Sequence, residues 1–159
     1  RLILAGEQRV LQSPLNHMVI RFSGLYGPNR HYLLDALQNE NVKLCHSLKF
    51  SNRIHVHDAA RVLYHVMRIK YNERIYIASD CEPTPINTIV AWLSATTGIP
   101  LPDMKHDDSP EPDDGRSNKK LNNARLLHTG FRFDFANYRQ GFKHILQENG
   151  MMPPPDATS

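Results

Sequence analysis

The sequence predicts an α/β fold in which short strands pair in parallel and helices pack against them. Short β-branched apolar runs alternate with segments of helical periodicity, an order that is typical of parallel sheets. Turn residues separate most of these segments. The chain has 159 residues, 40% of them hydrophobic, which is enough to bury one sizeable core.

The first half of the chain is predicted to alternate between helix and strand. Residues 2–11 have roughly helical periodicity. Pro14 follows them and is expected to end the helix, because proline cannot continue one. The run 17–22 is short, apolar and bounded by turn residues, which indicates a strand buried on both faces. The following elements are expected to be a short helix over 31–38, a short strand near 42–46 and an extended segment over 53–56.

A helix over 57–69 is predicted by apolar side chains at helical spacing, namely Ala59, Val62, Leu63, Val66 and Met67. Asp58 is expected to be its N-cap or a residue of its first turn, where a negative charge suits the helix dipole. A strand is predicted over 74–78, because this β-branched run follows a polar turn.

Another helix is predicted to begin at Thr84 and Pro85, with the threonine as cap and the proline as first helical residue. Gly98 stands where the residue after a helix end belongs. Residues 102–117 are rich in Asp and Pro and have no periodicity. We expect a solvated loop there, because the acidic residues match no calcium-loop spacing.

Two more helices are expected near the C-terminal end. Asn118 can cap a helix that runs to about His128. Asn137, with Gln140 three residues later, resembles a capping box for the last helix. Residues 149–159 are predicted to form a flexible, proline-rich tail.

The composition argues against several classes of protein. Cys45 and Cys81 lack CxxC spacing and are too few for a disulfide scaffold, so we expect reduced thiols in a cytoplasmic protein. No apolar run approaches the ~20 residues of a membrane helix. The net charge is +3 and Lys119–Lys120 is the only basic doublet, so neither nucleic acid nor membrane is an expected partner.

The histidines raise the question of a metal site. His55 and His57 would share one face of an extended segment and, with His46 or His65, could bind zinc. No other feature of the sequence supports such a site, so no metal is predicted.

Four segments carry recognisable patterns in a fixed order. They are a strand and loop at 19–28, the pattern R-x-x-V-x-D-x-A at 53–60, a strand and turn at 76–83 and an N-x-R-L-type element at 122–131. Together they resemble the extended and atypical short-chain dehydrogenases of the NAD-dependent epimerase/dehydratase family. The resemblance covers roughly residues 1–148, and each motif taken alone is moderately specific.

The resemblance implies the C-terminal part of a Rossmann-like parallel sheet plus a small α/β substrate domain. Residues 1–30 would be the last helix and strand region of the dinucleotide-binding core. Residues 31–70 would be a substrate-domain insertion and return helix, and residues 71–148 the final core strand and the C-terminal substrate-domain helices. In the family, a glycine-rich loop of the N-terminal half holds NAD or NADP, and this chain contains no such loop.

Site residues also follow from the resemblance. In relatives the loop after the strand passes beside the nicotinamide, so cofactor contacts are expected from Phe22, Ser23, Gly24 and Leu25. Tyr26 and Arg53 are expected to bind the substrate, since Arg53 matches an arginine that approaches a substrate phosphate. The alternatives are a packing role for Tyr26 and a surface or interdomain salt bridge for Arg53.

The implied function is that of the substrate-side half of an NAD(P)-dependent epimerase or dehydratase acting on a sugar nucleotide or a similar alcohol or carbonyl substrate. No catalytic residue is expected within the chain, because Ile3 stands where the family has a lysine and the paired tyrosine would precede residue 1. The chain alone is therefore expected to be inactive. The alternative is a non-catalytic dinucleotide-sensing or scaffold relative, which Ile3 and Gly24 favour. A third option is a self-contained protein that binds through its sheet edge. Relatives often form homodimers, which is also an expectation for this protein.

Overall fold

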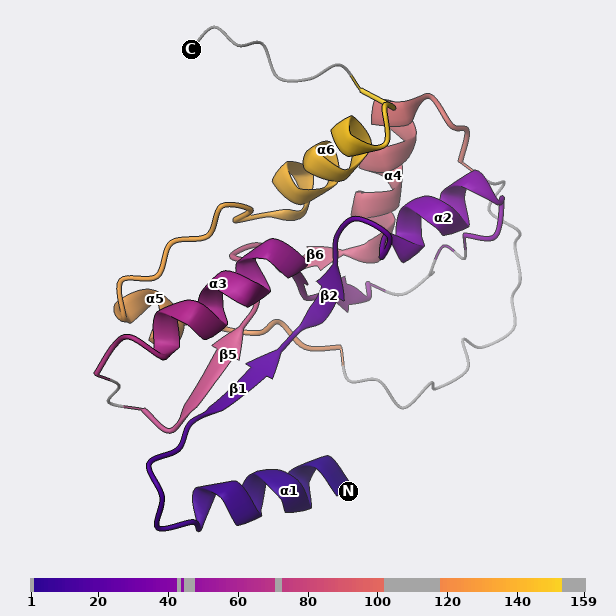
Figure 1. Ribbon diagram of the computed structural model, residues 1–159. Helices are drawn as coiled ribbons and strands as arrows, with labels where there is room; N and C mark the ends of the chain where they lie inside the picture. The colour runs from indigo at the N-terminus through magenta and orange to yellow at the C-terminus, as the bar shows by residue number, and fades with distance from the viewer. Residues whose placement is uncertain (1, 43, 45–47, 71–72, 102–117, 153–159) are drawn as a thin grey trace, which may run out of the picture.

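The computed structural model describes residues 2–42, 44, 48–70, 73–101 and 118–152 (Figure 1). The helices in these ranges are α1 (Leu2–Leu11), α2 (Tyr32–Gln38), α3 (Val56–Val66), α4 (Ile86–Thr97), α5 (Ala124–His128) and α6 (Tyr138–Glu148). The strands are β1 (Val19–Phe22), β2 (Gly24–Tyr26), β3 (Phe50–Ser51), β4 (Arg53–His55), β5 (Ile75–Ala78) and β6 (Thr84–Pro85).

The strands form two-stranded sheets, two of which are parallel. β1 pairs in parallel with β5, with Phe22 opposite Ala78, and β2 pairs in parallel with β4, with Gly24 opposite Arg53. The predicted α/β fold with parallel pairing is thus confirmed. β3 and β6 form an antiparallel pair, which the sequence did not predict.

The chain changes its strand partner between Ser23 and Gly24. The N–H of Ser23 donates to the carbonyl of Ala78 at 3.0 Å, at the end of β5. The next N–H, that of Gly24, donates to the carbonyl of Asn52 at 3.1 Å, beside β4. Figure 1 shows β1 and β2 as successive parts of one run. Open parallel sheets bind ligands at the carboxyl ends of strands where neighbours change, so this position is where a site is expected.

Two clusters of buried side chains hold the molecule together. The α2–α4–α6 cluster consists of Tyr26, Leu33, Leu34, Leu37, Ile89, Val90, Leu93, Tyr138, Phe142, Ile145 and Leu146. The α3–β5 cluster consists of Ile54, Ala59, Val62, Val66, Tyr76, Ala78, Leu126 and Phe131. In Figure 1 the helices of the first cluster lie beyond the end of β2, and α3 lies along β5. The change of partner therefore lies where the two clusters meet.

Local sequence signals predicted several element ends correctly. The Asn137 side chain accepts the N–H of Gln140 at 3.1 Å, and the Gln140 side chain accepts the N–H of Ala136 at 2.7 Å, which confirms the cap of α6. Gly98 ends α4 with φ 74°, a left-handed conformation that glycine adopts without a Cβ clash. The helix predicted over 57–69 is α3, which ends at Val66.

The predicted cap at Thr84 is wrong. Thr84 belongs to β6, where it lies opposite Ser51, and its hydroxyl donates to the carbonyl of Glu82 at 2.8 Å. The residue before α4 is Pro85, which has no side-chain capping bond. A strand pairing across the chain thus replaces the local cap.

The helix predicted from Asn118 is also wrong, because α5 begins only at Ala124. The Asn118 side chain accepts the N–H of Phe50 at 2.8 Å and donates to the carbonyl of Leu48. In return, the Asn52 side chain donates to one carbonyl and accepts one N–H of the segment 118–121. These four hydrogen bonds hold residues 118–121 beside β3, outside any helix.

Burial of β1 on both faces is not found. Within the described ranges β1 pairs only with β5, and each of its residues keeps some exposure. Arg21 points to α1, where its Nη2 lies 2.6 Å from Oε2 of Glu7, and this bond lowers the pKa of the Glu7 carboxyl. α1 itself buries no residue, and Leu2 and Ile3 are 90% and 82% exposed. The described chain therefore covers β1 incompletely.

Several predictions fall outside the described residues. These are most of the strand near 42–46, the loop 102–117, the end of the tail and the thiol of Cys45. Val42 and Leu44, which are described, belong to no strand. Cys81 is a free, exposed thiol. Among the helices that the structure describes, none has the length and apolar character needed to cross a membrane.

Candidate functional site

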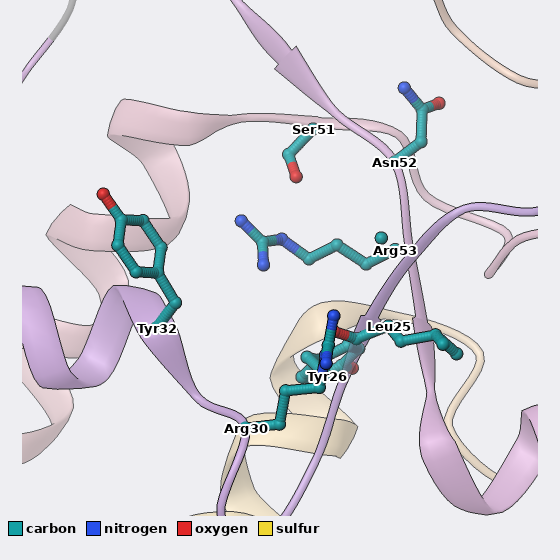
Figure 2. A pocket seen from close by; sticks show the side chains of 8 residues that line it. Leu25, Tyr26, Arg30, Tyr32, Ser51, Asn52 and Arg53 are labelled. Carbon is teal, nitrogen blue, oxygen red and sulfur yellow. The ribbon is translucent and has the colours of Figure 1, made fainter.

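A pocket opens where the chain changes its strand partner. Its volume is about 480 Å³, and it is lined by Gly24, Leu25, Tyr26, Arg30, Tyr32, Ser51, Asn52 and Arg53. Figure 2 shows the Arg53 side chain reaching across the pocket toward Tyr32, with Ser51 and Arg30 on opposite sides of it. Two segments, 24–32 and 51–53, therefore supply all the lining residues.

Close approach of β2 and β4 fixes the inner wall. Gly24 lies opposite Arg53, and a Cβ at Gly24 would lie only 3.1 Å from the carbonyl oxygen of Asn52. Glycine thus allows the two backbones to approach without displacing either strand.

A tight turn after β2 forms the outer wall. Asn29 has φ 60°, and Gly27 and Arg30 exchange backbone hydrogen bonds of 2.9 and 3.2 Å. The turn brings Arg30 back over β2, where its Nε donates to the carbonyl of Leu25 at 3.0 Å. At Gly27 a Cβ would lie 2.4 Å from Cγ2 of Val56, so this position also requires glycine.

Arg53 is the deeply placed charge of the pocket. Its carbonyl is fixed, since it accepts the N–H of Asp80 at 2.6 Å and the hydroxyl of Ser79 at 3.2 Å. Burial lowers the pKa of the guanidinium, and its Nε has no hydrogen-bond partner in the described structure. None of the described carboxylates forms an ion pair with it. A buried N–H donor without an acceptor is costly, so an anion in this pocket would stabilise Arg53.

Asp80 lies next to this arginine but does not line the pocket. Its side chain is buried, and burial raises its pKa to about 7. The N–H of Glu82, which donates to Oδ1 at 3.3 Å, and the charge of Arg53 oppose that rise. The carboxyl thus changes its protonation near neutral pH.

Tyr26 presents little of its side chain to the pocket. It is 2% exposed, and its ring packs against His55 and Phe142 with centroid distances of 5.4 and 5.1 Å. Its hydroxyl has no hydrogen-bond partner among the described groups, and burial raises its pKa. Gly141 of α6 makes room for it, because a Cβ there would lie 2.0 Å from the hydroxyl oxygen. Most contacts of the Tyr26 ring are therefore packing contacts, which agrees with the alternative role given to this residue from the sequence.

His55 stands behind Tyr26 and begins α3 as its N-cap. Its side chain accepts the N–H of His57 at 3.3 Å, which requires an unprotonated Nδ1. The ring is 1% exposed and packs against Phe135 and His144. Burial, together with the charge of His144, lowers the pKa of His55 to about 4.

We therefore expect acid to destabilise the fold through His55. Its folded pKa of about 4 lies below the ~6.5 of an exposed histidine. Its contribution is thus complete above about pH 6.5 and is lost as the pH falls toward 4. The loss can reach about 3 kcal/mol in the free energy of unfolding.

Urea denaturation of wild type and His55→Phe at about pH 7 and pH 4.5 isolates this contribution. The comparison is needed because Asp80 has the opposite sign: its raised pKa makes its contribution present in acid and lost as the pH rises through about 7. His55→Phe should lose less stability on acidification than the wild type. Equal losses in both proteins would contradict the role of His55.

Asp58 is not the N-cap of α3 but lies in its first turn, the second predicted position. Its buried carboxylate accepts the N–H of Asp134 at 3.0 Å, the N–H of Phe135 at 2.8 Å and Nη1 of Arg61 at 2.8 Å. Asp58 therefore anchors the segment before α6, which carries Phe135 onto His55.

The expected shared face of His55 and His57 is not found. His55 is buried at the end of β4, whereas His57 is exposed and its Nε2 lies 3.1 Å from Asp134. The helix begins at Val56, so the alternation of an extended segment stops there. Within the residues described, no group of three His, Cys, Asp or Glu side chains could hold a metal ion.

Four of the six predicted site residues line the pocket, namely Gly24, Leu25, Tyr26 and Arg53. Phe22 and Ser23 do not; they lie at the change of partner, and the buried hydroxyl of Ser23 has no hydrogen-bond partner in the described chain. The sequence did not single out the other lining residues, Arg30, Tyr32, Ser51 and Asn52. The turn signal Gly27-Pro28-Asn29 could have indicated that Arg30 returns to the strand.

The chain is similar to several solved structures. No model of a known protein family and no curated protein matches the sequence. A solved structure from Methylobacillus flagellatus, assigned to the NAD-dependent epimerase/dehydratases, is 28% identical with a TM-score of 0.72 and covers 92% of this chain and 52% of its own. A conserved protein of unknown function from Silicibacter pomeroyi is 27% identical with the same TM-score and covers 92% of this chain and 54% of its own.

A third similar structure is the Bordetella bronchiseptica enzyme WbmG in complex with NAD and UDP. It is 17% identical, with a TM-score of 0.69, and the match covers 93% of this chain and 50% of WbmG. Other similar structures contain NAD or NADPH. The chain spans about half the length of the structures that it matches. Fold and similarity thus confirm the recognition made from the sequence: the chain is similar, over almost its whole length, to one half of the NAD-dependent epimerase/dehydratases, consistent with their C-terminal half.

Proposed function

We propose that the chain is the substrate-side half of an NAD(P)-dependent epimerase or dehydratase that acts on a sugar nucleotide or a similar alcohol or carbonyl substrate. The observation that carries this proposal is Arg53, a half-buried arginine with a buried, unpartnered Nε and no ion-pair partner among the described residues, in a pocket at the change of strand partner. Guanidinium groups bind phosphates through paired N–H donors. A substrate phosphate would supply the missing negative charge.

The remaining site residues have distinct proposed roles. Tyr26 forms part of the pocket wall, and the loop from Phe22 to Leu25 faces the nicotinamide through its backbone. The unpartnered hydroxyl of Ser23 and the close approach at Gly24 fit a polar group lying against this loop. NAD or NADP, bound by the other half of the parent protein, would supply hydride transfer.

The same proposal assigns the parts of the chain and its setting. Residues 1–30 belong to the dinucleotide-binding core, residues 31–70 to the substrate-domain insertion and return helix, and residues 71–148 to the final core strand and the C-terminal substrate-domain helices. Support comes from the two clusters of buried side chains, which meet near the pocket. The parent protein would act in the cytoplasm, as a homodimer.

A non-catalytic, dinucleotide-sensing relative is the second candidate. Ile3, at the position where the family has its lysine, is 82% exposed on α1 and can transfer no proton. Both candidates share a phosphate at Arg53, and they differ in whether the ligand is turned over. A full-length protein that binds UDP and NAD but converts no sugar nucleotide would favour this second candidate.

Calorimetry on the 159-residue chain tests the phosphate role. We expect UDP to bind and NADH to show no measurable binding. Arg53→Gln should weaken UDP binding at least about tenfold, because a charge-assisted hydrogen bond contributes roughly 1.5–3 kcal/mol.

Arg125→Gln is the matched control, since Arg125 is exposed and its Nη1 lies 3.4 Å from Glu73, outside the pocket. It should bind UDP like the wild type. Unchanged UDP affinity in Arg53→Gln would remove Arg53 from the site. Tight NADH binding by the chain would contradict the assignment to the substrate side.

A further inference from the structure

A buried carboxyl group lies beside the pocket without lining it. Asp80 is 3% exposed and follows the end of β5 by two residues. Its N–H donates to the carbonyl of Arg53 at 2.6 Å, and the hydroxyl of Ser79 donates to the same carbonyl at 3.2 Å. The backbone that carries this carboxyl group is thus fixed against the strand that carries the pocket arginine.

The ionised form of this carboxyl group is weakly stabilised by its surroundings. Among the described groups one N–H donates to it, that of Glu82, at the long distance of 3.3 Å. Asp58, which is also buried, instead accepts three donors at 2.8 to 3.0 Å. No cation of the described ranges forms an ion pair with Asp80. Because a buried charge depends on few neighbours, the protonation of Asp80 should respond to a change of charge nearby.

Three ionisable side chains act on Asp80. Arg53 of β4 favours the carboxylate, whereas burial and the like charge of Glu82 oppose it, and the pKa of Asp80 is about 7 as a result. Glu82 itself pairs with Arg139 of α6 at 3.0 Å. The third side chain, Tyr26 of β2, stays uncharged near neutral pH, because burial raises the pKa of its phenol. The positive charge of Arg53 therefore keeps part of Asp80 ionised.

An anion bound in the pocket would change this balance. It would offset the charge of Arg53 and place a like charge near Asp80, and both effects favour the neutral carboxyl group. Asp80 is about half ionised at pH 7, so about half of the molecules can still accept a proton there. By linkage, the affinity for the anion should increase as the pH falls through neutrality.

We propose that Asp80 takes up a proton from solvent when an anion binds beside Arg53, so that ligand binding in this pocket is coupled to pH. The inference rests on the proposed phosphate role of Arg53 and adds the regulation of that site. The proton stays on the carboxyl group while the anion is bound and returns to solvent when the anion leaves. Mild acidification would then retain the ligand, and a rise in pH would release it.

Calorimetry of UDP binding at about pH 7, in two phosphate-free buffers of different ionisation enthalpy, measures the uptake. The apparent binding enthalpy should differ between the buffers, because the buffer supplies the proton. Since UDP can itself exchange protons, the readout is the difference between wild type and Asp80→Asn. Wild type should take up about a quarter to half a proton more per UDP than this variant.

Glu73→Gln is the matched control. Glu73 also carries a carboxylate, but it is exposed and pairs with Arg125 at 3.4 Å, outside the pocket. This variant should take up as much proton as the wild type. Equal uptake in wild type and Asp80→Asn would overturn the proposal.

The pH dependence of UDP affinity gives a second readout. Asp80→Asn carries a neutral amide at every pH, so it lacks the coupling. The ratio of the wild-type affinity to that of Asp80→Asn should fall at least about threefold between about pH 6 and about pH 8.5. Glu73→Gln should keep the wild-type profile. A ratio that stays constant over this range would count against Asp80.

NMR of the wild type with isotopically labelled aspartate carboxyl groups covers the case in which Asp80→Asn does not fold. One carboxyl signal should titrate near pH 7 in the free protein. This signal should move toward its protonated position when UDP is added at constant pH. A signal that does not move in the UDP complex overturns the proposal.

Failure of the two proposals is distinguishable. Weaker UDP binding in Arg53→Gln, without extra proton uptake by the wild type, removes the role of Asp80 and leaves the phosphate role of Arg53 standing. Absence of UDP binding by the wild type, or unchanged UDP affinity in Arg53→Gln, removes both.

Discussion

Replacement of Gly141 by alanine is expected to destabilise the protein by more than about 3 kcal/mol, at or above the upper end of ordinary overpacking effects. The new Cβ would lie 2.0 Å from the hydroxyl oxygen of Tyr26 and 2.6 Å from its Cζ. The ring cannot easily move, because His55 and Phe142 pack against it. Alanine is otherwise favoured over glycine inside a helix by about 1 kcal/mol, so a loss of stability reports the clash.

Urea denaturation of Gly141→Ala beside Gly6→Ala provides the matched comparison. Gly6 lies within α1, and a Cβ there would meet nothing within 4 Å. Gly6→Ala should therefore stabilise the protein slightly or leave it unchanged. Adding Tyr26→Ala to Gly141→Ala should remove the clash, so the double variant should be no less stable than Tyr26→Ala alone. A free energy of unfolding within about 1 kcal/mol of wild type for Gly141→Ala would contradict this packing.

Removal of the Asp58 carboxylate is expected to cost about 3–5 kcal/mol, as when one partner of a buried charged pair is lost. The side chain is fully buried, and Asp58→Ala would leave the N–H groups of Asp134 and Phe135 and one donor of Arg61 without their acceptor. The segment before α6 should then detach from α3. The free energy of unfolding from urea titration is the measurement.

Asp35→Ala is the control for this variant. Asp35 also lies near the start of a helix, but its side chain is 48% exposed and pairs with His31 across one helical turn. Exposed pairs of this kind contribute little, so the change should stay within about 0.5 kcal/mol. Equal losses in the free energy of unfolding for Asp58→Ala and Asp35→Ala would show that the buried hydrogen bonds of Asp58 contribute no more than the pair of Asp35 with His31.

Signals that depend on neighbouring residues were predicted well from the sequence. The Asn137 cap and the Gly98 helix end both depend on contacts within five residues, and both are confirmed. The periodicity of α3 likewise gave the right element, although not its last turn.

Predictions failed where a distant segment competes for the same group. The Asn118 side chain bonds to Phe50, which lies 68 residues away, and so caps no helix. Thr84 pairs with Ser51 across β3 and β6, so its backbone is strand rather than helix start. No local rule contains these partners.

The candidate site was predicted in part for the same reason. Gly24, Leu25 and Tyr26 follow a strand, and Arg53 lies in a family pattern, so single segments indicated them. Arg30 and Tyr32 reach the pocket only because the turn after β2 folds back. The lack of an ion-pair partner for Arg53 among the described residues becomes apparent only when its neighbours in three dimensions are known.

The composition of the pocket has an evolutionary consequence. Of its lining residues, only Tyr26 belongs to either cluster of buried side chains. Substitutions at Ser51 or Tyr32 would therefore leave both cores intact and cost little stability. Ligand preference can diverge by exchange of these few side chains, while selection for folding acts on a separate set of positions. The same scaffold could thus acquire new substrates without passing through an unstable intermediate sequence.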